Sequence, residues 1–200
     1  MDTEADTLLV QARAGDADAL GRLLSSHAPY LTILAKVQIG KQLAGKADTA
    51  DVVQETFLDA HRQFPKFRGT NGHELRLWLR RILAGQLALL LRRFLGPNRD
   101  MRLEREIELQ LDQSASALER GLVGSQSTPS RQVVRQEQAT LLADALATLP
   151  PDYRDVLVLR HLESLTFPEV AARMNRSENA THKLWARALA ALRHAMEGHA

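Results

Sequence analysis

The chain has 200 residues, of which 44% are hydrophobic, and its 26 lysine and arginine residues against 24 aspartate and glutamate residues give a formal net charge of +2. The apolar content suffices for the cores of one or two small domains, and the near balance of charge means that nucleic-acid binding must come from local clusters. The chain has no cysteine, it starts with the acidic MDTEAD, and its longest apolar run is LALLL at Leu87 to Leu91. These features argue against a disulfide scaffold, a signal peptide and a membrane span of about 20 residues, so we expect a soluble cytoplasmic protein.

Helical periodicity covers the first 95 residues. Apolar residues recur three or four positions apart in five segments, a spacing that places them on one face of a helix. No strand is needed to account for this part of the chain. The helices are predicted at Glu4–Ala14, Asp16–Ser26, Tyr30–Ile39, Thr49–Phe64 and Glu74–Leu95.

A segment of mixed character separates this block from a second one. GPN at Gly96 to Asn98 ends the first block, and GSQSTPS at Gly124 to Ser130 precedes the second. Between them, Met101 to Leu111 alternates like a strand although its Glu, Arg and Leu residues favour helix, so the pattern leaves it unassigned. We predict an all-α protein with two small helical domains, residues 1–95 and 131–200, joined by a linker at residues 96–130.

The second block has the spacing of a helix-turn-helix. After helices predicted from Ser130 to Leu149 and from Asp152 to Leu162, Thr166 can cap a helix that starts at Phe167, and Ser177 can cap the next one. Between these two helices Asn175 stands at the reversal, and asparagine accepts a left-handed conformation. A turn of three residues between two helices is typical of this motif.

The helix after Ser177 has one apolar and one basic side. Trp185, Leu189, Leu192 and Met196 fall close together at about 100° per residue, opposite Lys183, Arg187 and His194. A helix anchored by that apolar stripe would present its basic side to the major groove of DNA. A solvated amphipathic helix in an ordinary bundle is the alternative that this segment alone leaves open.

Charges in the first block are segregated between two neighbouring helices. On the predicted Thr49–Phe64 helix, four polar residues lie opposite an apolar side that we expect to be buried; this buried side consists of Val52, Val53, Thr56, Phe57 and Ala60. The next helix, from Leu75 to Leu95, contains five arginines and no acid. These two helices are therefore suited to partners of opposite charge.

Three segments together resemble a known family. Ala47–Gly69 (ADTADVVQETFLDAHRQFPKFRG), Leu75–Phe94 (LRLWLRRILAGQLALLLRRF) and Leu149–Ser177 (LPPDYRDVLVLRHLESLTFPEVAARMNRS) are similar, in that order, to the polymerase-binding, promoter-melting and fourth-region segments of bacterial sigma factors of the extracytoplasmic-function type. The resemblance covers nearly the whole chain. It implies a factor that binds core RNA polymerase through the β′ clamp and the β flap and directs it to promoters, with an inhibitory anti-sigma factor as a candidate further partner.

The resemblance also implies which residues contact each partner. Polymerase-binding residues are expected at Asp51, Gln54, Glu55 and Asp59. Contacts to the minus-ten promoter element, including capture of an unstacked base by the loop, are expected at Arg68, Gly69, Thr70, Asn71, Arg76, Arg80, Arg81 and Gln86. Contacts to the minus-thirty-five element are expected at Arg176, Ser177, Asn179, His182, Lys183 and Arg187. Many relatives have Asn near Gly85 and Asp near Leu89, so this helix offers fewer polar side chains for contacts with promoter bases.

Catalytic patterns are not found in the sequence. The histidines have no HExxH spacing, and neither GxxxxGK nor GxGxxG occurs, so we predict no enzyme activity, no cofactor and no metal site. A free-standing helix-turn-helix regulator remains the alternative function. It predicts a dimerisation or ligand domain in residues 1–95, where the DVVQETF and WLRRI segments are found instead.

Overall fold

A computed structural model describes residues 3–42, 47–95, 101–120 and 132–197, and the residues that it describes are helical or lie in turns and loops, with no strand among them. The chain divides into two compact units, residues 1–113 and 114–200. This confirms the predicted all-α class. The domain limits predicted at residues 95 and 131 stay a prediction, although the first unit extends beyond residue 95.

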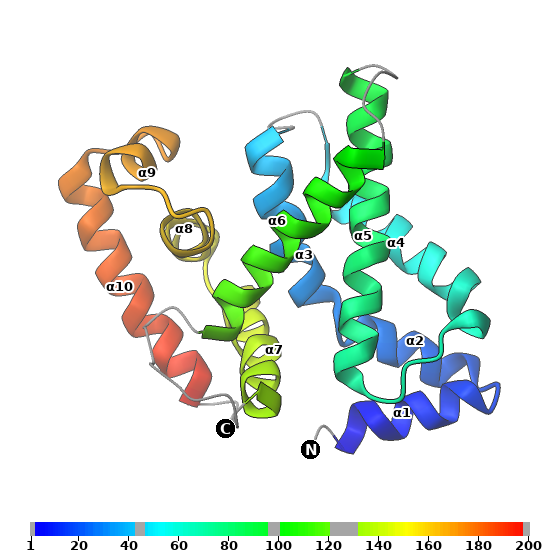
Figure 1. The fold of residues 1–200 in the computed structure, drawn as a ribbon. Coiled ribbons are helices and arrows are strands. Elements are labelled where there is room, and N and C mark those ends of the chain that lie inside the picture. Colours follow the sequence, from blue (N-terminus) through cyan, green and yellow to red (C-terminus); the bar gives the residue numbers. More distant parts are fainter. Residues whose placement is uncertain (1–2, 43–46, 96–100, 121–131, 198–200) are drawn as a thin grey trace. The chain divides into compact units, whose positions relative to one another are not determined.

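The first unit is built from five helices and the first part of a sixth (Figure 1). They are α1 (Thr3–Arg13), α2 (Ala17–Ser25), α3 (Ala28–Gln42), α4 (Thr49–Gln63), α5 (Gly72–Leu95) and α6 (Met101–Arg120), and a short 3₁₀ turn, η1 (Phe64–Lys66), follows α4. Each of the five predicted helices is present, with ends shifted by a few residues. The main difference is α6, which includes the segment that its sequence pattern left unassigned.

The core of the first unit follows a stripe of leucines along α5. Leu75, Leu79, Leu83 and Leu87 are spaced four residues apart and are almost completely buried. Helices α1, α3 and α4 pack against α5, and α1 packs against α2. The caps of α2 and α4 are aspartates, Asp16 and Asp48, whose carboxylates accept hydrogen bonds from backbone N–H groups of the first turn. The long helix α5 is thus covered on several sides, which limits how many of its side chains reach solvent.

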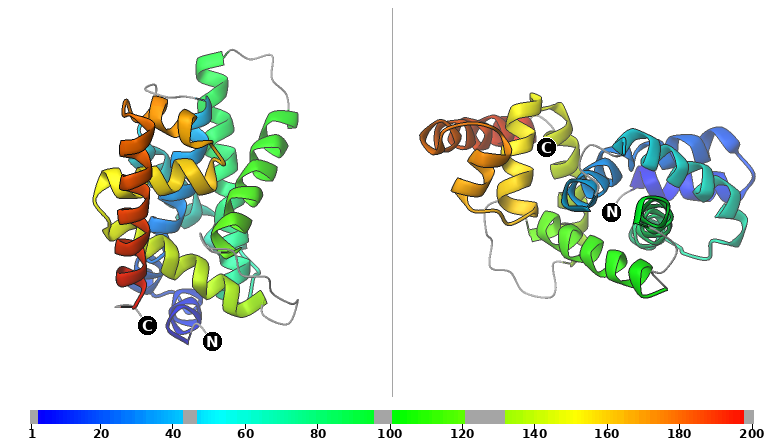
Figure 2. Two further views of the ribbon diagram at one scale, coloured as in Figure 1. Left: turned by 90° about the vertical axis from the view of Figure 1, so that its left-hand side faces the viewer. Right: turned by 90° about the horizontal axis from the view of Figure 1, so that it is seen from above.

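The second unit contains α7 (Gln132–Thr148), α8 (Pro151–Leu157), a π-helical turn η3 (Val158–Leu162), α9 (Phe167–Arg173) and α10 (Glu178–Glu197). Helix α10 packs against α7, α8 and α9. Figure 2 shows α9 and α10, in orange and red, joined by a short turn. The predicted helices of this block are confirmed, and the one that starts at Ser130 is described only from Gln132 onward.

Candidate polymerase and nucleic-acid surfaces

The loop between η1 and α5 is held by hydrogen bonds to the first turn of α5. The Glu74 carboxylate accepts hydrogen bonds from the backbone N–H and the hydroxyl of Thr70, the latter at 3.1 Å, and these bonds lower the pKa of the Glu74 carboxyl. The Asn71 side-chain oxygen in turn accepts the N–H of Glu74 at 3.0 Å. The polar groups that the sequence analysis assigned to base contacts thus also cap α5.

Gly69 lies where no other residue fits without rearrangement. A Cβ atom added there would lie 2.3 Å from Cζ of Phe67 and 2.8 Å from Cβ of Glu74. The Phe67 ring is itself fixed, because it packs on Trp78 with a centroid distance of 4.8 Å and on Phe64 at 6.0 Å. The glycine predicted from the loop sequence is therefore required by close packing over an aromatic cluster, with Arg68 exposed beside it.

Two arginines of α5 lie elsewhere than the sequence analysis expected. Arg76 and Arg80 are buried, and Arg80 donates a hydrogen bond to the hydroxyl of Tyr30 at 3.1 Å and pairs with Asp112 of α6 at 3.2 Å. The stripe that contains them faces the interior, because α5 is covered by α1, α3 and α4 and is bonded by α6. These two side chains are therefore buried in the structure, and their contact with DNA phosphates stays a prediction.

Two further arginines of α5 pair with acids of α6. Arg81 pairs with Glu108 at 3.2 Å and Arg92 with Glu104 at 3.9 Å. A Cβ atom at Gly85, which lies between the two arginines, would be 3.6 Å from a carboxylate oxygen of Glu104. The acids of α6 therefore lie along the α5 face on which the resemblance places promoter contacts. Sequence reasoning missed these contacts because the α6 segment was left unassigned, although its concentration of glutamates was the available signal.

Helix α4 exposes a stripe of polar residues. Asp51, Gln54 and Glu55 are exposed, while Val52, Val53, Thr56 and Ala60 on the other side are buried and Phe57 is half-buried. Leu58, one turn beyond Gln54 on the same stripe, is 48% exposed. The polar stripe of α4 therefore includes one exposed apolar side chain, which the pattern of polar residues did not indicate.

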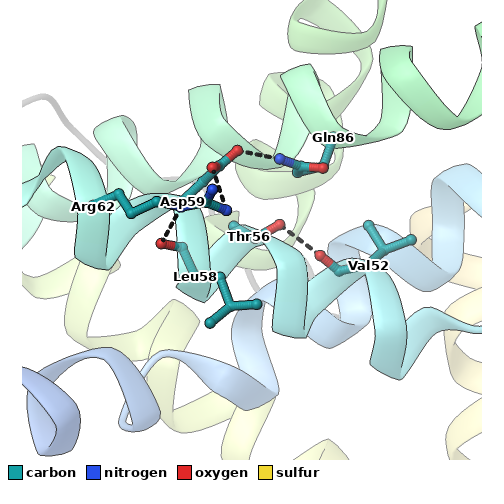
Figure 3. Close-up of polar contacts among 6 residues, drawn as sticks. All are labelled: Val52, Thr56, Leu58, Asp59, Arg62 and Gln86. Carbon is teal, nitrogen blue, oxygen red and sulfur yellow. Dashed lines mark hydrogen bonds and ion pairs between the residues drawn. The ribbon is translucent and has the colours of Figure 1, made fainter.

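Two of the predicted contact residues, Asp59 and Gln86, are hydrogen-bonded to each other (Figure 3). The amide of Gln86 on α5 donates a hydrogen bond to the carboxylate of Asp59 on α4, and the same carboxylate pairs with Arg62 at 3.0 Å. Thr56, one turn before Asp59 on α4, donates to the Val52 carbonyl at 2.7 Å within α4. The Asp59–Gln86 contact therefore joins α4 to α5, and it occupies groups that had been assigned to polymerase and to DNA.

The turn between α9 and α10 has the predicted caps. The Glu169 carboxylate accepts hydrogen bonds from the N–H and the hydroxyl of Thr166, at 2.7 and 2.6 Å, which lower the pKa of the Glu169 carboxyl. Asn175 has a φ of 52°, in the left-handed region. The Ser177 hydroxyl accepts the N–H of Ala180 at 3.2 Å. The predicted two-helix motif is thus present with its turn residues in the expected roles.

The buried side of α10 is narrower than its sequence pattern suggests. Thr181, Ala188 and Leu192 are buried, whereas Trp185, Leu189 and Met196 are half-buried. The Trp185 indole N–H donates to Nε2 of His161 at 3.0 Å, and its ring packs edge-on against Phe167 at 5.5 Å. Small residues at 181 and 188 allow close approach of the neighbouring helices, which the apolar pattern alone could not indicate.

The predicted minus-thirty-five residues lie on two different parts of the motif. Asn179, Lys183 and Arg187 are exposed along α10. The His182 ring lies tilted by 31° against the Phe167 ring with a centroid distance of 3.8 Å, and Arg176 pairs with Asp152 of α8 at 2.5 Å. Ser177 caps α10 as described. All six residues of the set are exposed, and Asn179, Lys183 and Arg187 form a stripe along α10.

Residues 3–42, 47–95, 101–120 and 132–197 contain no group of three or more His, Asp or Glu side chains arranged to hold a metal ion. Within the same ranges no helix is long and apolar enough to cross a membrane.

Both units match parts of one protein family. The family profile for Sigma-70 region 2 matches residues 23–94, and the profile for Sigma-70 region 4 matches residues 139–192. The chain thus combines the second and fourth regions of the Sigma-70 class of proteins in one all-α molecule.

Relatives define the branch of that class. The chain is 30% identical over 173 residues to the ECF RNA polymerase sigma-E factor of Escherichia coli (strain K12), covering 85% of this chain and 83% of that protein. It is also 30% identical to the ECF RNA polymerase sigma factor BldN of Streptomyces coelicolor, of which it spans 63%. In the solved RsbN–BldN complex, a chain with 23% sequence identity aligns over 93% of this chain and 97% of its own length, with a TM-score of 0.33. The chain belongs to the ECF (extracytoplasmic-function) sigma factors.

Family membership determines the general role of the protein. Sigma factors of this family bind RNA polymerase and promoter DNA, and the chain is accordingly a transcription initiation factor.

Proposed function

We propose that the chain docks on the β′ clamp of core RNA polymerase through the exposed stripe of α4 and directs it to promoters by two DNA contacts. The loop at residues 67–71 captures an unpaired base of the minus-ten element. Helix α10 enters the major groove of the minus-thirty-five element with Asn179, Lys183 and Arg187.

One observation carries this proposal. The exposed α10 stripe lies opposite buried Thr181, Ala188 and Leu192 in a motif with capped helices and a left-handed turn residue, so the stripe is anchored and directed outward. A free-standing regulator would use the same motif. The match of residues 23–94 to Sigma-70 region 2, in the part where a regulator needs a dimerisation or ligand domain, supports the initiation factor instead.

The α4 stripe is the part of the proposal that a single experiment tests most sharply. Asp51, Gln54, Glu55 and Leu58 provide acids around an apolar side chain, which suits a basic and partly apolar partner surface. Asp59 is not included, because its carboxylate is bonded to Gln86 and Arg62.

The experiment is a binding assay with core polymerase and the double variant Asp51→Arg/Glu55→Arg. Both side chains are exposed, so the fold should survive with a change in stability of about 0.5 kcal/mol or less, as checked by circular dichroism. Polymerase binding and promoter-specific transcription should be lost through like-charge repulsion. The matched control is Glu4→Arg/Asp18→Arg, which reverses one exposed acid on α1 and one on α2. Normal holoenzyme formation by the α4 variant would exclude this helix as the docking surface.

A further inference from the structure

Helix α1 contacts the promoter loop at two points. A carboxylate oxygen of Asp6 accepts the backbone N–H of Gly72 at 3.2 Å, and the guanidinium of Arg13 donates to the backbone carbonyl of Gly69. The Arg13 guanidinium also lies 5.9 Å from the centroid of the Phe67 ring. Asp6 and Arg13 are seven residues apart, two turns of helix, so they lie on one face of α1. That face of α1 therefore contacts the loop at Gly69 and Gly72, on both sides of Thr70 and Asn71.

One of the two contacts supplies an acceptor for a backbone N–H group at the start of α5, and the other binds a carbonyl of the preceding loop. Gly72 begins α5, and the N–H groups of a first turn have no acceptor within their helix. Asp6 supplies one from a part of the chain 66 residues away. The loop is therefore bonded both to the first turn of α5, through Thr70 and Glu74, and to helix α1.

We propose that Asp6 and Arg13 are positioning residues that hold the backbone from Gly69 to Gly72 in the conformation that reads an unpaired promoter base. The proposal rests on the proposed function, in which this loop captures the base. Neither residue touches the base; they act through the Gly69 carbonyl and the Gly72 amide. The reading of one base requires donors and acceptors fixed in direction, and a surface loop of this length has little intrinsic rigidity to provide that.

An alternative for Arg13 is a direct phosphate contact, and the geometry argues against it. The guanidinium is already engaged by the Gly69 carbonyl and lies over the Phe67 ring. A phosphate contact would contribute to the salt dependence of DNA binding, whereas a positioning residue would not.

The test uses holoenzyme reconstituted from core polymerase and the full chain. Wild-type holoenzyme first selects single-stranded DNA from a pool of random sequence, which identifies the position with the strongest base preference. Four oligonucleotides that differ only at this position are then compared in binding to Arg13→Ala, Asp6→Ala and Asp6→Asn. The variant Arg22→Ala, which removes an exposed arginine of α2, is the control for loss of charge.

The expected result is a loss of base preference without a loss of charge-dependent binding. In Arg13→Ala and Asp6→Ala the ratio between the preferred and the next base should fall by roughly fivefold or more, the lower end of what one good base contact provides. The salt slope and core binding should stay at the wild-type values. Asp6→Asn retains an acceptor for Gly72 and should keep the preference, as should Arg22→Ala. Hydrogen exchange of the Gly72 amide should be faster in Asp6→Ala than in Asp6→Asn.

Each of the other outcomes contradicts one of the two proposals or both. Equal weakening for all four bases with a smaller salt slope in Arg13→Ala would make Arg13 a phosphate contact. Faster exchange at Gly72 with unchanged base preference would show that α1 restrains the loop without serving base reading, and the positioning proposal would fall while the proposed function stands. If wild-type holoenzyme selects no base, or if substitution of Thr70 and Asn71 by alanine leaves the preference intact, the loop is not the reader and both proposals fail.

Discussion

Gly69 is a tightly packed residue within the loop that we propose captures a promoter base. Its missing Cβ leaves room for the Phe67 ring and the Glu74 side chain, so replacement must displace one of them. Gly21 in α2 provides the opposite case, because a Cβ there would meet nothing within 4 Å. The same change, glycine to alanine, should therefore have opposite effects at the two positions.

We predict that Gly69→Ala destabilises the protein by about 1 to 3 kcal/mol, the usual cost of overpacking. Gly21→Ala should stabilise it by about 0.5 to 1 kcal/mol, because alanine is favoured over glycine within a helix. Urea denaturation of the two variants measures both values. Equal effects from the two substitutions would mean that the loop accommodates the new methyl group at no cost.

His161 connects the stability of the second unit to pH. Burial, and secondarily the charge of Arg160, lowers the pKa of His161 below its ordinary value near 6.5, and its Nε2 accepts the indole N–H of Trp185. Because the folded pKa is depressed, the unfolded chain takes up the proton first as pH falls. The stabilising contribution is therefore complete above about pH 6.5 and is lost as pH falls through the lowered folded pKa.

We predict that the difference in free energy of unfolding between the wild-type protein and His161→Gln becomes smaller as the pH falls from 7.5 to 5. The reason is that glutamine can accept the same hydrogen bond but does not titrate. The free energy of unfolding measured across this range by urea denaturation provides the check. The control His194→Gln replaces an exposed histidine of α10 and is measured over the same pH range. A constant difference at every pH would exclude His161 as the titrating group.

At the scale of elements, α6 bears most directly on DNA binding. Its Glu104 and Glu108 pair with Arg92 and Arg81 of α5, whose side chains are 43% and 71% exposed. Pairs this exposed contribute only about 0.2 to 1 kcal/mol each, so DNA phosphates can compete for the arginines, but the nearby acids would oppose the approach of a phosphate.

We predict that Glu104→Gln/Glu108→Gln increases the affinity of the full chain for single-stranded DNA and steepens its salt slope by about 0.7 for each arginine that gains a phosphate. The control is Glu106→Gln on the same helix, which removes one exposed acid where the double variant removes two, so the effects are compared per charge removed. Fluorescence anisotropy over a salt series measures both quantities. If the double variant and the control behave alike, α6 does not compete with DNA.

The exposed stripe of α10 allows two kinds of DNA contact to be separated. Lys183 and Arg187 are four residues apart, so a helix in the major groove can direct one to a base edge and the other to a phosphate. Neither side chain belongs to the α4 stripe that we assign to polymerase, so core binding should not depend on them.

We predict that Arg187→Ala costs about 1 to 3 kcal/mol and relaxes preference at one position of the minus-thirty-five element, if its guanidinium is bidentate to a guanine. Lys183→Ala should weaken all sequences alike and reduce the salt slope by about one. Footprinting of holoenzyme on single-base promoter variants distinguishes the two effects. If both variants gave the wild-type footprint, the α10 stripe would be a solvent-exposed face that does not contact DNA.

At the scale of the whole molecule, binding strength depends on having both DNA contacts in one complex. The chain carries a net charge of only +2, and it divides into two small units, each with one proposed DNA surface. Two linked DNA contacts give a higher overall affinity when both engage the DNA at once. In the proposed function, polymerase binding allows both units to engage the promoter together.

We therefore predict weak binding of duplex promoter by the free chain and specific initiation when core polymerase is added. Gel-shift assays at about 150 mM salt, a physiological ionic strength, and in vitro transcription provide the measurements. Tight and sequence-specific binding by the free protein as a dimer would instead favour the free-standing regulator.

The sequence by itself determined the helical class, the position of most helices and the helix-turn-helix. These depend on local physics: apolar spacing, the caps at Thr166 and Ser177 and the left-handed Asn175 are all set by residues close together in the chain. The family resemblance, now confirmed, likewise rested on short motifs such as DVVQETF.

Only the tertiary structure decided which polar side chains are occupied within the fold. Arg80 is bonded to Tyr30 and Asp112, Gln86 to Asp59, and Asp6 to Gly72, at separations of 27 to 66 residues. The sequence reveals that an arginine lies on a helix but not which distant carboxylate reaches it, because that depends on how the helices pack. For the same reason Arg76 and Arg80 were expected at the surface and are buried, and α6 became a helix along α5 where the pattern of its residues alone was ambiguous.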